Sequence, residues 1–178
     1  MARSIDELLE AFHSAASLSS SVSRLDLLMD LVATGDPRVP SILLHVMTDS
    51  NEPRAARIAA LKQMRNGHGT SAARPRIAAA IAALLSDAAD PQVSLQAALA
   101  LRDFTDVEGV VVALGRIALG VDYSPELRYA AFTALERAEQ NPGYPTLLRQ
   151  LADDTLLGRV ASSALRLWAT RRTPTPNP

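Results

Sequence analysis

The sequence predicts an all-α protein, built as an α-solenoid of about four to five helical pairs. Alanine and leucine, both strong helix formers, make up about a third of the 178 residues. Apolar and polar residues seldom alternate one by one, so the pattern typical of β-strands is nearly absent. In addition, helix-length segments resemble one another at intervals of 30 to 38 residues, which is typical of repeat proteins.

Four segments of the chain share one internal pattern. Each opens with Pro or Thr and has Ala six residues later, and the last three have Leu ten residues after the opening. The openings, separated by 38, 34 and 30 residues, are Pro53, Pro91, Pro125 and Thr155. The shared residues are Ala59, Ala97, Ala131 and Ala161, then Leu101, Leu135 and Leu165. Because small residues let helix axes approach closely, and one pair cannot bury both of its apolar faces, this pattern predicts stacked helical pairs.

We call the helices that begin at these openings, together with one earlier helix, the A helices, and those between them the B helices. The expected A helices cover residues 24–34, 53–64, 91–104, 125–138 and 155–168. The expected B helices cover residues 39–47, 75–86, 107–119 and 144–153. The expected organisation is a capping helix with a serine-rich linker at 1–21, the repeats at 22–172, and a disordered proline-rich tail at 173–178. The glycine-containing stretch from residue 66 to residue 74 is expected to be a loop.

Residues typical of helix starts precede most A helices. Asp90, Ser124 and Asp154 stand directly before the openings, where their side chains can accept hydrogen bonds from the free amides of the first turn. Proline at the first helical position loses only an amide that would have no partner there. Glu52, directly before Pro53, is a weaker version of the same signal.

The repeated unit resembles a known family. A turn with Asp-Pro and Val, an alanine pair and a leucine, followed by a helix such as Val-Pro-x-Leu-Leu, is similar to the bacterial HEAT-like repeats of the phycobilisome-lyase type. The resemblance covers about residues 22–170 and is best at 36–47 and 90–101. It implies an α-solenoid whose B helices line a concave face. It also implies A-helix arginines that pair with acids in the turns, at Arg57, Arg128 and Arg159, with Ser94-Leu95 at this place in the third repeat.

Composition and charge exclude several classes of protein. Eighteen basic and nineteen acidic residues give a net charge of −1, so the chain lacks the positive field that attracts nucleic acid or anionic lipid. The absence of cysteine excludes disulfides, thiolate nucleophiles and Cys-ligated metal sites. The acidic start lacks the apolar run of a secretory signal, and the longest apolar run, 77–85, is far shorter than the roughly 20 residues that a bilayer requires. We expect a cytoplasmic protein with no membrane partner.

Residue types used in catalysis and metal binding form no recognisable motif. His13, His45 and His68 show no metal-ligand spacing, and none forms the His-Glu pairs of HEAT-like di-iron hydroxylases. No Gly-x-Ser-x-Gly motif occurs either. The sequence therefore predicts a protein that is not an enzyme and that uses no cofactor and no metal. His45 is either a groove residue or a structural or solvated histidine, and His68, between two glycines, belongs to a plain connector or an anion-binding loop.

Two features of the sequence indicate surfaces to which a partner could bind. Residues 53–86 hold six basic side chains and no acid, which predicts either a solvated face or a dock for an acidic protein segment or phosphate groups. These basic residues are Arg54, Arg57, Lys62, Arg65, Arg74 and Arg76. The expected B helix at 107–119 carries only Glu108 and Arg116 as charges and contains three consecutive valines. It is either covered on both sides or exposes a mild apolar strip suited to a partner.

Taken together, these features predict a non-catalytic interaction or scaffold module that binds a segment of another protein, an acidic one among the candidates, along the concave B-helix face. The expected contact residues are the polar side chains of the B helices: Arg38, Ser41, His45, Arg76, Arg116, Arg149 and Gln150. One alternative, based on the resemblance, is an accessory subunit or lyase-like enzyme that handles a chromophore. Another is a weak nucleic-acid or phosphate binder through residues 53–86, although nucleic acid is less favoured because no aromatic residues are interleaved for base stacking. The oligomeric state is left open.

Overall fold

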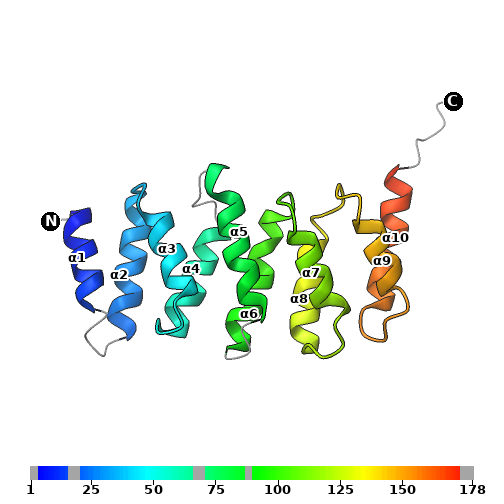
Figure 1. Cartoon of the computed structure of the whole chain (residues 1–178), viewed down its shortest axis with the longest axis horizontal. Coiled ribbons are helices and arrows are strands. Elements are labelled where there is room, and N and C mark those ends of the chain that lie inside the picture. Colours follow the sequence, from blue (N-terminus) through cyan, green and yellow to red (C-terminus); the bar gives the residue numbers. More distant parts are fainter. Residues whose placement is uncertain (1–3, 16–20, 66–70, 87–89, 173–178) are drawn as a thin grey trace. The chain divides into compact units, whose positions relative to one another are not determined.

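The computed structural model describes residues 4–15, 21–65, 71–86 and 90–172. Within these ranges the chain is helical and contains no β-strand, so the predicted all-α class is confirmed. The α-helices are α1 (Ile5–Ala15), α2 (Ser21–Thr34), α3 (Val39–Thr48), α4 (Arg54–Arg65), α5 (Arg74–Ala83), α6 (Pro91–Ala100), α7 (Val110–Leu119), α8 (Pro125–Leu135), α9 (Tyr144–Leu151) and α10 (Gly158–Arg172) (Figure 1). Short 3-10 helices are η1 (Ser71–Ala73), η2 (Leu84–Ser86) and η3 (Leu101–Phe104). Most of the predicted linker, His68 and the predicted tail lie outside the described residues.

Two helices begin three residues later than predicted, α7 at Val110 and α10 at Gly158. Gly109, directly before α7, has a φ of 85°, a left-handed conformation that glycine adopts without strain. The chain therefore turns sharply at Gly109, and residues 107–109 stay outside the helix. At the start of α10, a Cβ atom on Gly158 would lie 2.6 Å from the carbonyl oxygen of Ala152, so only glycine fits this close approach of two backbone segments.

The helices divide into two compact units, residues 1–96 and 97–178, and the division falls within α6. In the first unit, α1 packs against α2, and α3 packs against α4. Helix α2 also packs against α4, and α3 also packs against α5. Helices two places apart in the chain therefore share a core, whose fully buried side chains include Phe12, Leu28, Leu43, Leu61 and Ile81.

The second unit repeats this arrangement. Helix α7 packs against α8, α9 packs against α10, and α7 also packs against α9. The A-type helix α8 contacts η3, which continues directly from α6. Side chains that are fully buried here include Leu101, Leu114, Ile117, Leu135 and Leu151.

The predicted helix starts carry the expected hydrogen bonds. The Asp90 carboxylate accepts from the backbone N–H groups of Gln92 and Val93, and the Ser124 hydroxyl accepts from that of Leu127 at 3.3 Å. The Asp154 carboxylate accepts from Leu156 at 2.9 Å and from Leu157 at 2.8 Å. These three side chains satisfy backbone donors that have no partner inside a helix.

A buried side chain on three A helices bonds to the preceding B helix in the same way. Arg57 Nε donates to the carbonyl of Met47 at 3.3 Å, and Arg128 Nε donates to the carbonyl of Ala118 at 3.0 Å. Ser94 stands at the corresponding place in the helix between them, and its hydroxyl donates to the carbonyl of Leu84 at 3.0 Å. Each acceptor lies ten residues before its donor. In the third repeat, where Ser94 stands in place of arginine, the shorter serine side chain therefore makes the same hydrogen bond to a carbonyl ten residues earlier.

Of the arginines expected to pair with acids in the turns, Arg128 does so. Its Nη2 lies 2.5 Å from an Asp154 carboxylate oxygen, and both side chains are almost fully buried. Arg159 is exposed, and no ion pair within the described residues involves it. A second buried pair, Arg24 with Glu52, is not predicted by the sequence, which favours Glu52 as a helix cap.

Candidate functional site

All seven expected contact residues are exposed. In the first unit these are Arg38, Ser41, His45 and Arg76, and in the second unit Arg116, Arg149 and Gln150. The sequence therefore predicted correctly which residues of the B helices are exposed at these seven positions. Exposure makes the seven side chains accessible to a partner, but their local surroundings differ.

Arg38 is already engaged within its own unit. Its guanidinium donates to Asp36 at 2.9 Å and to Asp6 at 2.8 Å, so it ties the start of α3 to α1. The hydrogen bonds from Arg38 hold the pKa of Asp36 below its ordinary value. His45 Nε2 lies 4.0 Å from an Asp49 carboxylate oxygen, too far for a hydrogen bond. Arg38 thus stabilises the contact between the start of α3 and α1, and it is also exposed to a partner.

The basic residues of 53–86 do not form one continuous surface. Arg57 is only 5% exposed and is bonded to the Met47 carbonyl, so its assignment to a basic patch is wrong. Arg54 Nε lies 2.7 Å from Asp90, which neutralises it. Burial alone would raise the pKa of Asp90, but the bond from Arg54, together with the Val93 and Gln92 amides and the charge of Arg54, outweighs burial and lowers that pKa. Lys62 is exposed, whereas Arg65 and Arg74 are half-buried. A count of charges along the sequence overstated the patch, because one member points into the core and another has an acid beside it.

The second unit contains a hollow between α7 and α9, which we call the α7/α9 hollow; the two helices are neighbours in Figure 1. Its volume is about 500 Å³. It is lined by Gly109, Val111, Val112, Gly115, Arg116, Leu119, Asn141, Gly143, Thr146, Leu147 and Gln150. Two of the predicted contact residues, Arg116 and Gln150, therefore lie at one site. The other lining residues were not predicted as contacts, although the three consecutive valines mark α7 as an unusual helix in the sequence.

The apolar side chains of α7 divide between core and hollow. Val110 and Val111 are buried, whereas Val112 is 76% exposed and Leu119 is 37% exposed. The alternative that this helix is covered on both sides is therefore wrong, and the alternative that it exposes a mild apolar strip is confirmed. A side chain as exposed as Val112 gains little from folding, and its burial by a partner is favourable.

Gly115 allows α7 and α9 to approach closely at the α7/α9 hollow. A Cβ atom on this residue would lie 3.2 Å from both methyl carbons of Leu147 on α9. That distance is shorter than the 3.5–4.0 Å of an optimal carbon–carbon contact. The absence of a side chain at Gly115 therefore lets Leu147 pack directly against α7, and both residues are buried.

The lining of the α7/α9 hollow carries charge of one sign. Arg116 is the one ionisable residue of its lining, and Arg149, next to Gln150 on α9, is a second exposed arginine. Within the part of the chain that the structure describes, neither guanidinium has a hydrogen-bond or ion-pair partner. The site therefore combines an apolar strip with cations that lack an anion.

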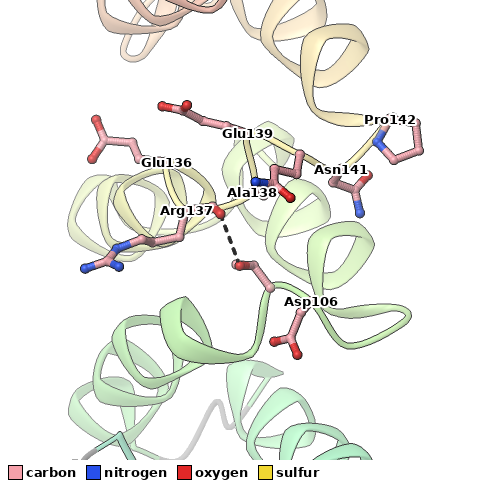
Figure 2. A pocket seen from close by; sticks show the side chains of 9 residues that line it. Asp106, Glu136, Arg137, Ala138, Glu139, Asn141 and Pro142 are labelled. Atoms are coloured by element: carbon pink, nitrogen blue, oxygen red, sulfur yellow. Dashed lines mark hydrogen bonds between the residues drawn. The ribbon is translucent and has the colours of Figure 1, made fainter.

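A second hollow, of about 630 Å³, lies between the turn after η3 and the segment after α8, and it is polar. It is lined by Thr105, Asp106 and residues 136–142, and the Thr105 hydroxyl donates to the Arg137 carbonyl at 3.4 Å. Figure 2 shows the Asp106 carboxylate turned away from those of Glu136 and Glu139. Burial, together with the charges of Glu136 and Glu139, raises the pKa of the nearby Tyr144 to about 12.

These acids do not converge on one point, and no group of three or more potential ligands within the described residues is arranged to hold a metal ion. Trp168, the other aromatic residue in this region, donates from its indole to the Glu139 carbonyl at 3.2 Å. It thus joins α10 to the segment after α8. Among the helices of the described ranges, none is both long enough and apolar enough to cross a membrane.

Comparison of the chain with models of known protein families finds no match, and comparison with curated proteins finds none either.

Proposed function

We propose that this protein is a non-catalytic interaction module, an α-solenoid of HEAT-like helical pairs that binds a segment of another protein along its B helices. The observation that carries the proposal is the α7/α9 hollow, where Val112 is 76% exposed beside an arginine without a partner. An exposed apolar strip marks a site of interaction, and arginine is enriched in protein interfaces.

The solenoid part of the proposal is supported by contacts that recur from layer to layer. Within each unit, B helices contact the next B helix, as α3 does with α5 and α7 with α9. The buried bond from an A helix to a carbonyl ten residues earlier occurs in three helices, at Arg57, Ser94 and Arg128. Repeats that contact only their neighbours in this regular way are the basis of solenoid architecture.

A protein segment is favoured over a polyanion as the partner. Phosphate recognition needs several cations acting together, since each contact adds to binding through counterion release. In residues 53–86, however, Arg57 is buried and Arg54 is paired with Asp90. The remaining cations of this segment leave less charge than the sequence indicated, whereas the α7/α9 hollow offers both apolar and polar contacts.

Selection from a display library of random peptides tests the proposal. Peptides of about 12 residues suit it, because they reach about 40 Å when extended. We expect the wild-type protein to enrich peptides that bind poorly to the triple variant Arg76→Glu, Arg116→Glu, Arg149→Glu. The matched control is Lys62→Glu, Arg159→Glu, Arg166→Glu, which makes the same charge change at three exposed A-helix positions. Equal binding to both triple variants, with both folded by circular dichroism, would remove the B helices from the proposed function.

A further inference from the structure

We infer that the α7/α9 hollow takes a partner segment that carries two apolar side chains about 10 Å apart with a carboxylate between them. This inference rests on the proposed function and specifies the chemistry of its partner. It follows from the order of side chains along the exposed strip of α7, from the charge of the lining and from the volume of the hollow.

The spacing comes from the geometry of one helix. Val112, Arg116 and Leu119 all line the hollow and follow one another at intervals of four and three residues, so they lie on the same side of α7. At 1.5 Å per residue, Val112 and Leu119 are about 10 Å apart along the axis, with Arg116 between them. A segment that covers the strip therefore meets an apolar position, a cationic position and a second apolar position in that order.

The charge of the lining selects the sign of the partner. No Asp or Glu lines the α7/α9 hollow, and Arg116 has no partner among the residues that the structure describes. A guanidinium binds a carboxylate with two parallel hydrogen bonds, and such charge-assisted bonds are stronger than neutral ones. Arg149, exposed on the facing helix α9, adds a second positive charge near the same site. A basic segment would be repelled by both arginines.

Space for an apolar side chain exists beside Arg116. Val112 and Leu119, on either side of it along α7, are exposed and line the hollow, whereas Gly115 and Leu147 are buried against each other. The hollow of about 500 Å³ lies within the range of about 300–1,000 Å³ that is typical of sites for organic groups. A leucine or phenylalanine of the partner can therefore bury itself against Val112 or Leu119 while a neighbouring carboxylate reaches Arg116.

The composition of the peptides enriched by the wild-type protein tests this inference. We expect an Asp or Glu flanked by large apolar residues, and we expect Arg116→Glu and Val112→Asp each to weaken binding of a labelled synthetic copy at least about tenfold. Both residues are exposed, so neither change should unfold the protein, and Arg116→Gln provides a milder variant. The matched controls are Arg166→Glu and Leu167→Asp on α10, an exposed arginine beside an exposed leucine, which should leave binding unchanged.

Three results would overturn the inference, and they can be told apart. Enriched peptides that bind through Arg76 but not through the two α7 residues would leave the proposed function standing and move the site elsewhere. Enriched basic peptides would contradict the charge argument alone. A selection that enriches nothing would contradict both this inference and the proposed function.

Discussion

Arg128 and Asp154 connect two A helices through one short bond. The Arg128 Nη2 atom lies 2.5 Å from Asp154 Oδ2, while Asp154 Oδ1 accepts from the backbone of Leu156 and Leu157. The same arginine also donates to the Ala118 carbonyl on α7. One buried side chain therefore joins α7, α8 and the turn before α10, and one carboxylate completes both the ion pair and the turn.

Substitution of Asp154 tests the importance of this junction. Asp154→Ala removes the ion pair and both turn hydrogen bonds, and leaves the buried Arg128 without an anion. Breaking a buried pair from one side costs about 3–5 kcal/mol. We expect a loss of about 3 kcal/mol in the free energy of unfolding, measured with chemical denaturant. Asp153→Ala, at the exposed neighbouring position, is the control and should change stability by less than about 0.5 kcal/mol.

The same carboxylate makes stability depend on pH. Burial opposes the ionisation of Asp154, but hydrogen bonds from the Leu157 amide and the Arg128 guanidinium outweigh it and hold its pKa below the ordinary 3.8. A group with a lowered pKa in the folded state contributes stability that is complete above its unfolded pKa and is lost as pH falls through the folded pKa. The stability difference between wild type and Asp154→Asn should therefore be constant from about pH 7 to about pH 5 and shrink below about pH 4. Denaturant unfolding at a series of pH values measures it, and a difference that grows on acidification would contradict the assignment.

Arg24 and Glu52 form a second buried junction, in the first unit. Arg24 donates to both carboxylate oxygens of Glu52 and to the Phe12 carbonyl at 2.6 Å, and its guanidinium lies 4.1 Å from the centre of the Phe12 ring. It therefore ties α1 and α2 to the turn before α4. Arg24→Met should cost about 3 kcal/mol, because Glu52 is then buried without its cation.

A double-mutant cycle separates the ion pair from the packing of Arg24. Adding Glu52→Leu to Arg24→Met should recover at least half of the lost stability, since an apolar pair leaves no buried charge. Equal and additive losses for the two single variants would show that the two residues act independently, contrary to the observed geometry.

The starts of the A helices could be predicted because their determinants are local. An Asp or Ser followed by proline caps a helix through residues two or three positions away, and the structure confirms this at Asp90 and Ser124. The Arg24–Glu52 pair joins residues 28 positions apart, and that contact depends on how α2 packs on α4. No local sequence pattern predicts a contact between residues so far apart in the chain, so the sequence indicates Glu52 only as a weak helix cap.

The α7/α9 hollow was predicted in part, for a related reason. Three consecutive valines indicate an unusual helix, but a continuous apolar run does not indicate which of its members faces the core. The packing of α7 against α8 and α9 decides this, and it leaves Val110 and Val111 buried and Val112 exposed. The contribution of α9 to the hollow depends on tertiary packing and has no signal in the sequence of α7.

Gly115 provides a test that separates the stability of the second unit from its binding. In a helix, alanine is favoured over glycine by about 1 kcal/mol, and the new Cβ atom would meet only the flexible end of Leu147, at 3.2 Å. Gly115→Ala should therefore keep the free energy of unfolding within about 1 kcal/mol of wild type. The added methyl group would displace the side chain of Leu147, a lining residue of the hollow, so affinity for an enriched peptide should fall several-fold, as measured by fluorescence anisotropy.

The control for Gly115→Ala must change a helix without changing the hollow. Gly120→Ala is not suitable, because its Cβ atom would lie 2.6 Å from the Tyr123 ring. Thr133→Ala serves instead, since Thr133 is a half-buried residue of α8 outside the lining of the hollow, and alanine is again the better helix former. This control should leave peptide binding unchanged. Unchanged affinity in Gly115→Ala as well would mean that binding does not depend on the position of Leu147 in the lining of the hollow.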